Sequence, residues 1–209
     1  MKLYHLDRSG RLPLKQPVSL IPMNRLPPEV RCSPFLAAFP DGISNHGFIH
    51  LSNSCPYIHS YSIGNSKDAL DPDSFAQEKS VVDSRIIEFD FELIRRLYFP
   101  CAPSRFTAFF AVEDPSEFEQ WPEIYNREAF PELHVVEIDA PDDTPRFDSR
   151  LLKSGIAFGK DDIGYYIGCW PMSTFDIALQ YWSGIGSESP RWEYLIKLPI
   201  AQANMKVVS

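Results

Sequence analysis

A glutamate inside an otherwise apolar stretch near the carboxyl end has the clearest chemical potential. Glu193 lies in Trp192–Leu198, a stretch between two prolines that predicts a strand. Side chains alternate along a strand, so Glu193 shares a face with Leu195 and Lys197, away from the more apolar face. Burying a carboxylate without a partner is costly and raises its pKa. The sequence therefore predicts either a glutamate that faces a cleft or an ion pair with Lys197 or an arginine.

Other polar side chains lie at the ends of predicted elements, far from Glu193 in sequence. His5 lies on a first strand, and Arg8 follows the end of that strand. Ser104 precedes a near-continuous apolar run, and Tyr181 lies near the end of a predicted helix. Residues 1–40 carry six basic and two acidic groups, so this end of the chain is a candidate for holding an anionic small molecule.

A metal site is not expected from the histidines. His46 and His50 are four residues apart and His59 is nearby, and on a helix this spacing suits one ion. The segment contains Gly47, however, and predicts a strand over Phe48–Leu51. Positions four apart on a strand are about 13 Å apart, too far to share one ion.

Several familiar signatures of chemistry are absent from the sequence. It contains no GxxxxGK[ST] and no GxGxxG, which argues against P-loop nucleotide hydrolases and Rossmann dinucleotide-binding domains. It also contains no HExxH and no GxSxG, which argues against zincin metalloproteases and hydrolases with a nucleophile elbow. The cysteines are far apart and without a CxxC pair, so we expect reduced thiols rather than disulfides or a zinc knuckle: Cys32, Cys55, Cys101 and Cys169.

Length and composition predict one folded domain over residues 1–209. The chain has 209 residues, and 44% hydrophobic residues are ample for a packed core. Twenty basic and 28 acidic residues give a net charge of −8, which argues against tight binding to a phosphate backbone. No segment reaches the roughly 20 apolar residues of a membrane span, and the start lacks the apolar region of a signal peptide. We therefore expect a cytoplasmic protein without a membrane or nucleic-acid partner.

Hydrophobic periodicity predicts an α+β fold in which strands and helices alternate irregularly. Residues 11–40 hold seven prolines and predict a long wrapping loop, and 62–80 predict a polar surface excursion. Helices are expected from Ile86 to just before Pro100, after the capping box of Asp114–Glu117, and from a second box at Ser173–Asp176 to near Trp182, with Gly184 beyond. Strands are expected at Lys2–Asp7, Phe48–Leu51, Phe106–Val112, His134–Asp139 and Trp192–Leu198.

Four segments carry a family resemblance that extends over nearly the whole chain. They read LYHLDRSGRL, GISNHG, PSRFTAFFAVED, and YWSG followed by PRWEYLIKLPI. In this order they resemble a family of mostly uncharacterised bacterial and phage proteins with an ADP-ribosyltransferase-like fold. That resemblance implies two small sheets that form a cleft for NAD, with flanking helices.

The resemblance also implies roles for the candidate residues. His5 or Arg8 would contact the ribose or phosphate of NAD, and Ser104 would line the site. The ring of Tyr4 or Tyr181 is a candidate for stacking on nicotinamide, with a place in the core as the favoured alternative for each. Glu193 would contact the nicotinamide ribose. Cleavage of the bond between nicotinamide and ribose builds positive charge on the sugar, and a fixed carboxylate stabilises that charge.

Departures from the better-known transferases leave the activity open. Arg191 stands two residues before Glu193, where arginine-directed transferases carry Glu or Gln, and there is no Ser-Thr-Ser triplet. We expect transfer of ADP-ribose to an unidentified macromolecule, or hydrolysis of NAD. One alternative is a non-catalytic binding module of the same fold. Another is an RNA 2′-phosphotransferase, which needs a basic face and is disfavoured by the net charge.

Overall fold

The computed structural model has two antiparallel sheets, a short hairpin and a layer of helices. It describes residues 1–8, 10, 12–52, 72–122, 125–126, 128, 130–160 and 165–208, and their side chains except at 52, 72–83, 156–160, 165–169 and 171. Within this part of the chain, no helix is long and apolar enough to span a bilayer.

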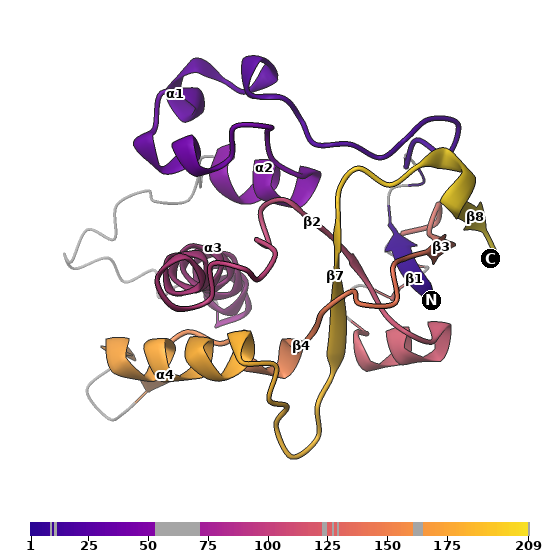
Figure 1. Cartoon of the computed structure of the whole chain (residues 1–209). Helices are drawn as coiled ribbons and strands as arrows, with labels where there is room; N and C mark the ends of the chain where they lie inside the picture. Colours follow the sequence, from indigo (N-terminus) through magenta and orange to yellow (C-terminus); the bar gives the residue numbers. More distant parts are fainter. Residues whose placement is uncertain are drawn as a thin grey trace.

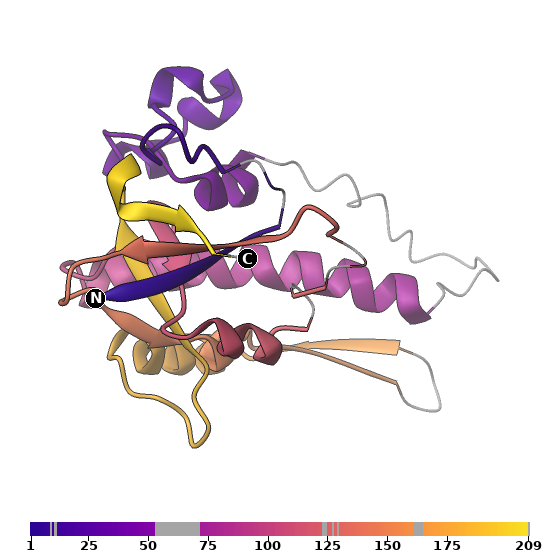
Figure 2. The same cartoon turned by 90° about the vertical axis from the view of Figure 1, so that its right-hand side faces the viewer.

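The two larger sheets are three-stranded and lie side by side (Figure 1). One has the order β1-β3-β8, and the central one has the order β2-β7-β4. The hairpin pairs β5 with β6 and projects beyond the sheets (Figure 2). The bounds of the strands are β1 Lys2–Asp7, β2 Ala108–Ala111, β3 His134–Asp139, β4 Arg146–Asp148, β5 Ile156–Lys160, β6 Tyr165–Cys169, β7 Trp192–Lys197 and β8 Met205–Val207.

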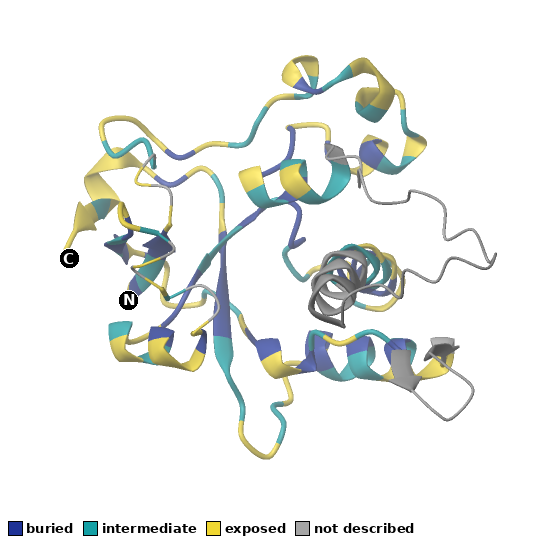
Figure 3. Cartoon of the chain, turned by 180° about the vertical axis from the view of Figure 1, so that it is seen from behind, coloured by how far each residue is buried: buried dark blue, intermediate teal, exposed yellow. Residues whose placement is uncertain are grey.

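Helices cover the face of the central sheet that is turned away from β1-β3-β8 (Figure 1). The α-helices are α1 Pro28–Arg31, α2 Asn45–Ser52, α3 Pro72–Tyr98 and α4 Pro171–Trp182. Short 3₁₀ helices lie at Met23–Arg25, Pro34–Ala38, Pro115–Gln120, Ser149–Leu151 and Gln202–Asn204. In Figure 3, β7 is largely buried and β2 is partly buried, whereas the segment around α1 is largely exposed or intermediate.

The register of the central sheet decides which side chains meet the helices. Phe110 pairs with Leu195, and Phe109 pairs with Ile196. Directly paired residues share a face of the sheet, and neighbours along a strand alternate. Phe110 and Leu195 therefore lie on one face, together with Glu193, while Phe109 and Ile196 lie on the other.

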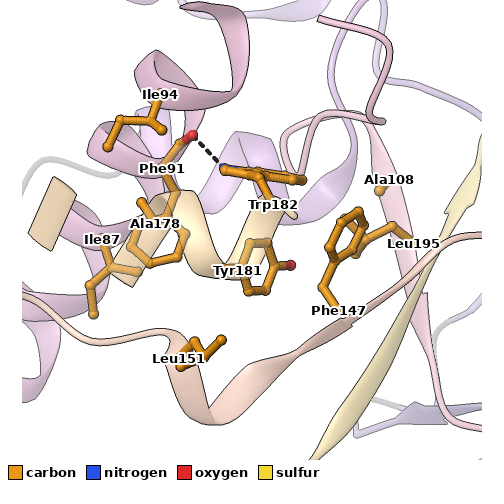
Figure 4. Packing of buried hydrophobic residues seen from close by; sticks show 10 residues of the cluster. All are labelled: Ile87, Phe91, Ile94, Ala108, Phe147, Leu151, Ala178, Tyr181, Trp182 and Leu195. Carbon is orange, nitrogen blue, oxygen red and sulfur yellow. Dashed lines mark hydrogen bonds between the residues drawn. The ribbon is translucent and has the colours of Figure 1, made fainter. Parts of the chain in front are cut away.

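A core of aromatic side chains fills the space between the central sheet and the helices (Figure 4). The Tyr181 ring stacks on Phe147 at 4.9 Å between centroids, and Trp182 donates a hydrogen bond of 2.7 Å to the backbone oxygen of Phe91. Other members of this core are Ile87, Ile94, Ala108, Leu151, Ala178 and Leu195.

A second core lies between the two sheets. Leu3 and Ile138 from β1-β3-β8 pack against Ala111, Tyr194 and Ile196 of the central sheet. Tyr4 and Val112 exchange two backbone hydrogen bonds of 2.8 Å, which join β1 to the chain just beyond β2. The central sheet is therefore covered on both faces.

Most predicted strands are confirmed, and the exception is Phe48–Leu51. This segment belongs to α2, so the strand prediction was wrong. The hydroxyl of Ser44 accepts a hydrogen bond from the backbone N–H of Gly47, which caps the helix at 3.1 Å. A Cβ at Gly47 would stand well inside van der Waals contact with the backbone oxygen of Phe106. This glycine lets α2 approach the neighbouring backbone closely, and it does not break the helix.

Helix ends were predicted better than helix starts. The end of α3 at Tyr98 agrees with the expected stop before Pro100, but α3 begins at Pro72. Residues 72–80 are therefore helical rather than an excursion, whereas 62–71 lie outside the described residues. The predicted capping box at Ser173–Asp176 was wrong, because α4 already begins at Pro171. The Thr174 hydroxyl instead accepts a hydrogen bond from the backbone N–H of Gly155.

The other boundary predictions are confirmed at least in part. The capping box at Asp114 is present, although the helix that follows is a short 3₁₀ helix, Pro115–Gln120. Gly184 follows α4 with a φ of 74°. The expected loop over 11–40 contains α1 and two of the 3₁₀ helices.

Candidate functional site

A buried arginine connects three elements on the helix-covered face of the central sheet. Arg105 donates to both carboxylate oxygens of Glu88, from Nε at 2.9 Å and from Nη2 at 2.8 Å. Its Nη1 contacts the carboxylate of Glu193 and donates to the hydroxyl of Tyr181 at 2.7 Å. These four residues, here named the Arg105 cluster, come from α3, α4, β7 and the segment before β2. All of them are buried.

The elements position these groups through their ordinary periodicities. Glu193 lies opposite Phe147 of β4 and on the same face as Leu195, so it points toward α3 and α4. Glu88 and Phe91 are three residues apart on α3 and therefore share the buried side of that helix. The Arg105 guanidinium lies 4.8 Å from the centre of the Phe110 ring, which supports it from the sheet.

A second ionic cluster lies one turn further along α3. Glu92 binds Arg95 at 2.8 Å and 2.9 Å and Arg96 at 2.8 Å, and accepts a hydrogen bond from the Ser104 hydroxyl at 2.7 Å. We name these four residues the Glu92 cluster. Because Ser104 directly precedes Arg105, the two clusters adjoin, and α3 contributes one carboxylate to each.

Burial and charge act against each other within the Arg105 cluster. Burial alone raises the pKa of Glu88, but Arg105 outweighs this and holds the pKa well below its usual range. Burial alone lowers the pKa of Arg105, but the carboxylates of Glu193 and Glu88 outweigh this and hold the pKa well above its usual range. Burial, with the Glu193 carboxylate beside it, raises the pKa of Tyr181 well above 10. Glu88 and Arg105 are therefore charged, and Tyr181 carries its proton.

The Glu193 carboxylate is held through one of its two oxygens. Arg105 Nη1 and the Tyr181 hydroxyl both bind Oε1, the latter at 2.8 Å. No residue that the structure describes hydrogen-bonds to Oε2. The side chain is 11% exposed. One oxygen is thus fixed, and the other is left for solvent or a ligand.

Three of the candidate residues lie together, on the helix-covered face. Tyr181 and Glu193 are directly hydrogen-bonded, and Ser104 belongs to the adjoining Glu92 cluster. Arg8 is exposed, and its guanidinium lies 5.4 Å from the centre of the Phe130 ring.

His5 faces the other side of the central sheet. Its Nδ1 lies 2.7 Å from the backbone oxygen of Phe110, and its ring lies 4.0 Å from that of Phe109. Phe109 is on the face opposite Glu193. Since a carbonyl oxygen only accepts, Nδ1 carries the proton and Nε2 is left as an acceptor. Burial outweighs this hydrogen bond and lowers the pKa of His5 to about 4.

Two hollows flank Lys197 at the end of β7. One, of about 300 Å³, is lined by Arg95, Ser104 and Thr107 among others. The other, of about 330 Å³, is lined by Pro103, Thr144 and Phe147 among others. Neither lining includes Glu193 or His5, and of the candidate residues Ser104 alone lines one of these two hollows.

The sequence reasoning missed Glu88, Glu92 and the role of Arg105. Glu88 and Glu92 interrupt the apolar face of α3 formed by Ile87, Phe91 and Ile94, and this interruption was the available signal. A carboxylate next to such a face predicts a buried cationic partner.

One protein family covers the chain almost from end to end. Residues 3–206 match the family described as "Protein of unknown function (DUF2441)". The chain belongs to this family. No curated protein matches the sequence. Membership therefore places the chain among relatives of unknown function and assigns no activity to the Arg105 cluster.

Proposed function

We propose that this DUF2441 protein is an NAD-binding enzyme of the ADP-ribosyltransferase type. It would transfer ADP-ribose to a macromolecule or hydrolyse NAD, with Glu193 as the group beside the nicotinamide ribose. One observation carries the proposal: Glu193 is held by two donors on Oε1, while Oε2 has no hydrogen bond to a described residue. A carboxylate fixed in this way needs no reorganisation before it meets a developing positive charge.

The charge balance of the Arg105 cluster supports this role. Arg105 alone would neutralise Glu193, but Glu88 offsets the guanidinium with two hydrogen bonds. Two carboxylates and one guanidinium leave one excess negative charge, which favours a cationic transition state such as an oxocarbenium ion. Tyr181 is fully buried, so its part is to position Glu193 through its hydroxyl and not to stack on nicotinamide.

Two further residues limit the proposal. Arg191, two residues before Glu193, binds the backbone oxygen of Gln120 at 2.9 Å and does not offer the carboxylate or amide of arginine-directed transferases. His5 lies against Phe109 on the opposite face of the sheet from Glu193, so the proposal assigns it no contact with NAD. The proposal therefore rests on Glu193 rather than on convergence of all candidates.

The test is release of nicotinamide, or transfer of label, from labelled NAD, with the protein alone and with cell lysate. Glu193→Gln keeps the shape and removes the charge, so we expect the rate to fall by about 10²–10³-fold with NAD affinity nearly unchanged. Glu92→Gln is the matched control, because Glu92 is also a buried, arginine-bound carboxylate. Equal activity in wild type and Glu193→Gln would remove the catalytic role.

The ion pair itself favours a second candidate, a non-catalytic interaction module. If Glu193 only neutralises Arg105, both Glu193→Gln and Glu92→Gln lower the melting temperature and no NAD-dependent reaction occurs. Millimolar NAD then leaves the melting temperature unchanged. A ligand at 100 times its dissociation constant adds about 2.7 kcal/mol to the stability of the native state, so binding would be visible.

A further inference from the structure

The helix α2 brings two histidines to the edge of the Arg105 cluster. His46 and His50 are one turn apart, with ring centroids at 4.2 Å, and α3 supplies Glu88 beside them. One ligand atom from each of the three residues can be chosen so that all lie within 4.8 Å of one another. A strand over this segment would have placed the two histidines too far apart to share one ion. Because the segment is helical, both side chains lie on the same side of α2.

The hydrogen bonds leave the right nitrogen atoms available. His50 Nδ1 lies 3.0 Å from the backbone oxygen of His46, so Nδ1 carries the proton and Nε2 holds a lone pair. Metal-binding histidines commonly donate their other N–H to a backbone carbonyl in this way.

His46 already faces one of the other proposed ligands. Its Nε2 is buried and lies 3.1 Å from Glu88 Oε1, within ion-pair distance but without the geometry of a hydrogen bond. Tetrahedral bonds of 2.0–2.1 Å place ligand atoms about 3.3 Å apart, close to this separation. The ligand atoms of the three residues lie up to 4.8 Å apart, so the longest of these distances has to shorten by about 1.5 Å when an ion binds. Rotation of a half-buried imidazole ring about its side-chain bonds supplies such a shift.

Charge also favours a cation at this place. Glu88 and Glu193 oppose a single guanidinium, which leaves one negative charge in excess in a buried setting. Each carboxylate oxygen of Glu88 has two lone pairs, so Oε1 can accept from Arg105 and still bind an ion. Arg105 then holds the ligand carboxylate in place, as groups behind metal ligands commonly do.

We propose that His46, His50 and Glu88 form a site for a zinc-type transition-metal ion. Two imidazoles and one carboxylate suit Zn²⁺ or Co²⁺ and do not suit Mg²⁺, which prefers a shell of oxygen ligands. Three protein ligands leave a fourth position for water. The site stands on its own residues and does not depend on the proposed reaction with NAD.

The experiment is titration of the untagged full-length protein with Co²⁺, followed by displacement with Zn²⁺. We expect one Co²⁺ per chain, the visible absorption of a tetrahedral cobalt site, and its loss when Zn²⁺ is added. Mg²⁺ should not displace Co²⁺. Loss of a group that holds a metal ligand in place typically weakens metal binding by about 10–100-fold. Loss of a ligand itself should therefore weaken Co²⁺ binding by about 100-fold or more.

His50→Gln is the decisive variant, because this half-buried side chain makes no ion pair with Arg105 and its loss should preserve the fold. His134→Gln is the matched control, since His134 is also half-buried but lies on β3, outside this group. Circular dichroism before each titration shows that both variants are folded. Co²⁺ binding of His50→Gln at wild-type affinity, or equal weakening by His134→Gln, would overturn the site. Absence of tetrahedral absorption in wild type would do the same.

Discussion

A single hydroxyl group stabilises two charged partners at Tyr181. It accepts from Arg105 and donates to Glu193, and the ring is fully buried. Tyr181→Phe removes only this oxygen, and hydrogen bonds to charged groups contribute about 1.5–3 kcal/mol each. We expect the free energy of unfolding in urea to fall by about that amount. Tyr98→Phe, at an exposed position, is the control and should change it by less than about 0.5 kcal/mol.

The neutral imidazole of His5 links stability to pH. Its pKa is lowered from 6.5 to about 4 in the folded protein, so between these values the unfolded chain binds the extra proton. Stability is therefore highest above pH 6.5 and falls as the pH drops toward 4. The upper bound from this group is about 3 kcal/mol.

The measurement for His5 is urea unfolding at pH 7 and pH 4.5 for wild type and His5→Gln. Gln can still donate to the backbone oxygen of Phe110 but does not titrate. We expect the variant to lose less stability than wild type over this interval. An identical loss in both proteins would show that other groups cause the pH dependence.

At the scale of elements, the close approach of α2 depends on one glycine. Gly47→Ala improves helix propensity by about 1 kcal/mol, yet the new Cβ would overlap the backbone oxygen of Phe106. Overpacking of this kind typically costs about 1–3 kcal/mol, so we expect net destabilisation in thermal melts. Ile49→Ala, on the exposed side of the same helix, should be nearly neutral. A more stable Gly47→Ala protein would contradict this packing.

The same glycine explains how far prediction from sequence could reach. Strands such as His134–Asp139 were predictable because alternation or an apolar run marks them locally. Gly47 lies within a helix because it lets the backbone of Phe106, 59 residues away in sequence, pack closely against α2. No local sequence pattern contains that information. Likewise Glu193 suggested a partner or a cleft, but only tertiary packing decided that the partner is Arg105 rather than Lys197.

At the scale of the whole molecule, β2 and the residue that follows it connect the cores. Ala108 belongs to the helix-side core, Ala111 to the core between the sheets, and Val112 to a third apolar cluster with Leu6 and Trp121. We therefore expect residues 1–209 to unfold as one unit. In native-state hydrogen exchange, the slowest amides of β3 and α4 should report the same free energy within about 1 kcal/mol. A gap of several kcal/mol would instead indicate two units.

The Arg105 cluster has a kinetic consequence. Its hydrogen bonds join Arg105 to residues 17, 76 and 88 positions away along the chain. Partial assembly would desolvate a charge before its partners arrive, so the cluster should form after the main barrier to folding has been crossed. It then governs how long the native state persists rather than how quickly it is reached. Rapid-mixing experiments should show unfolding accelerated about tenfold or more in Tyr181→Phe, with refolding in dilute urea almost unchanged.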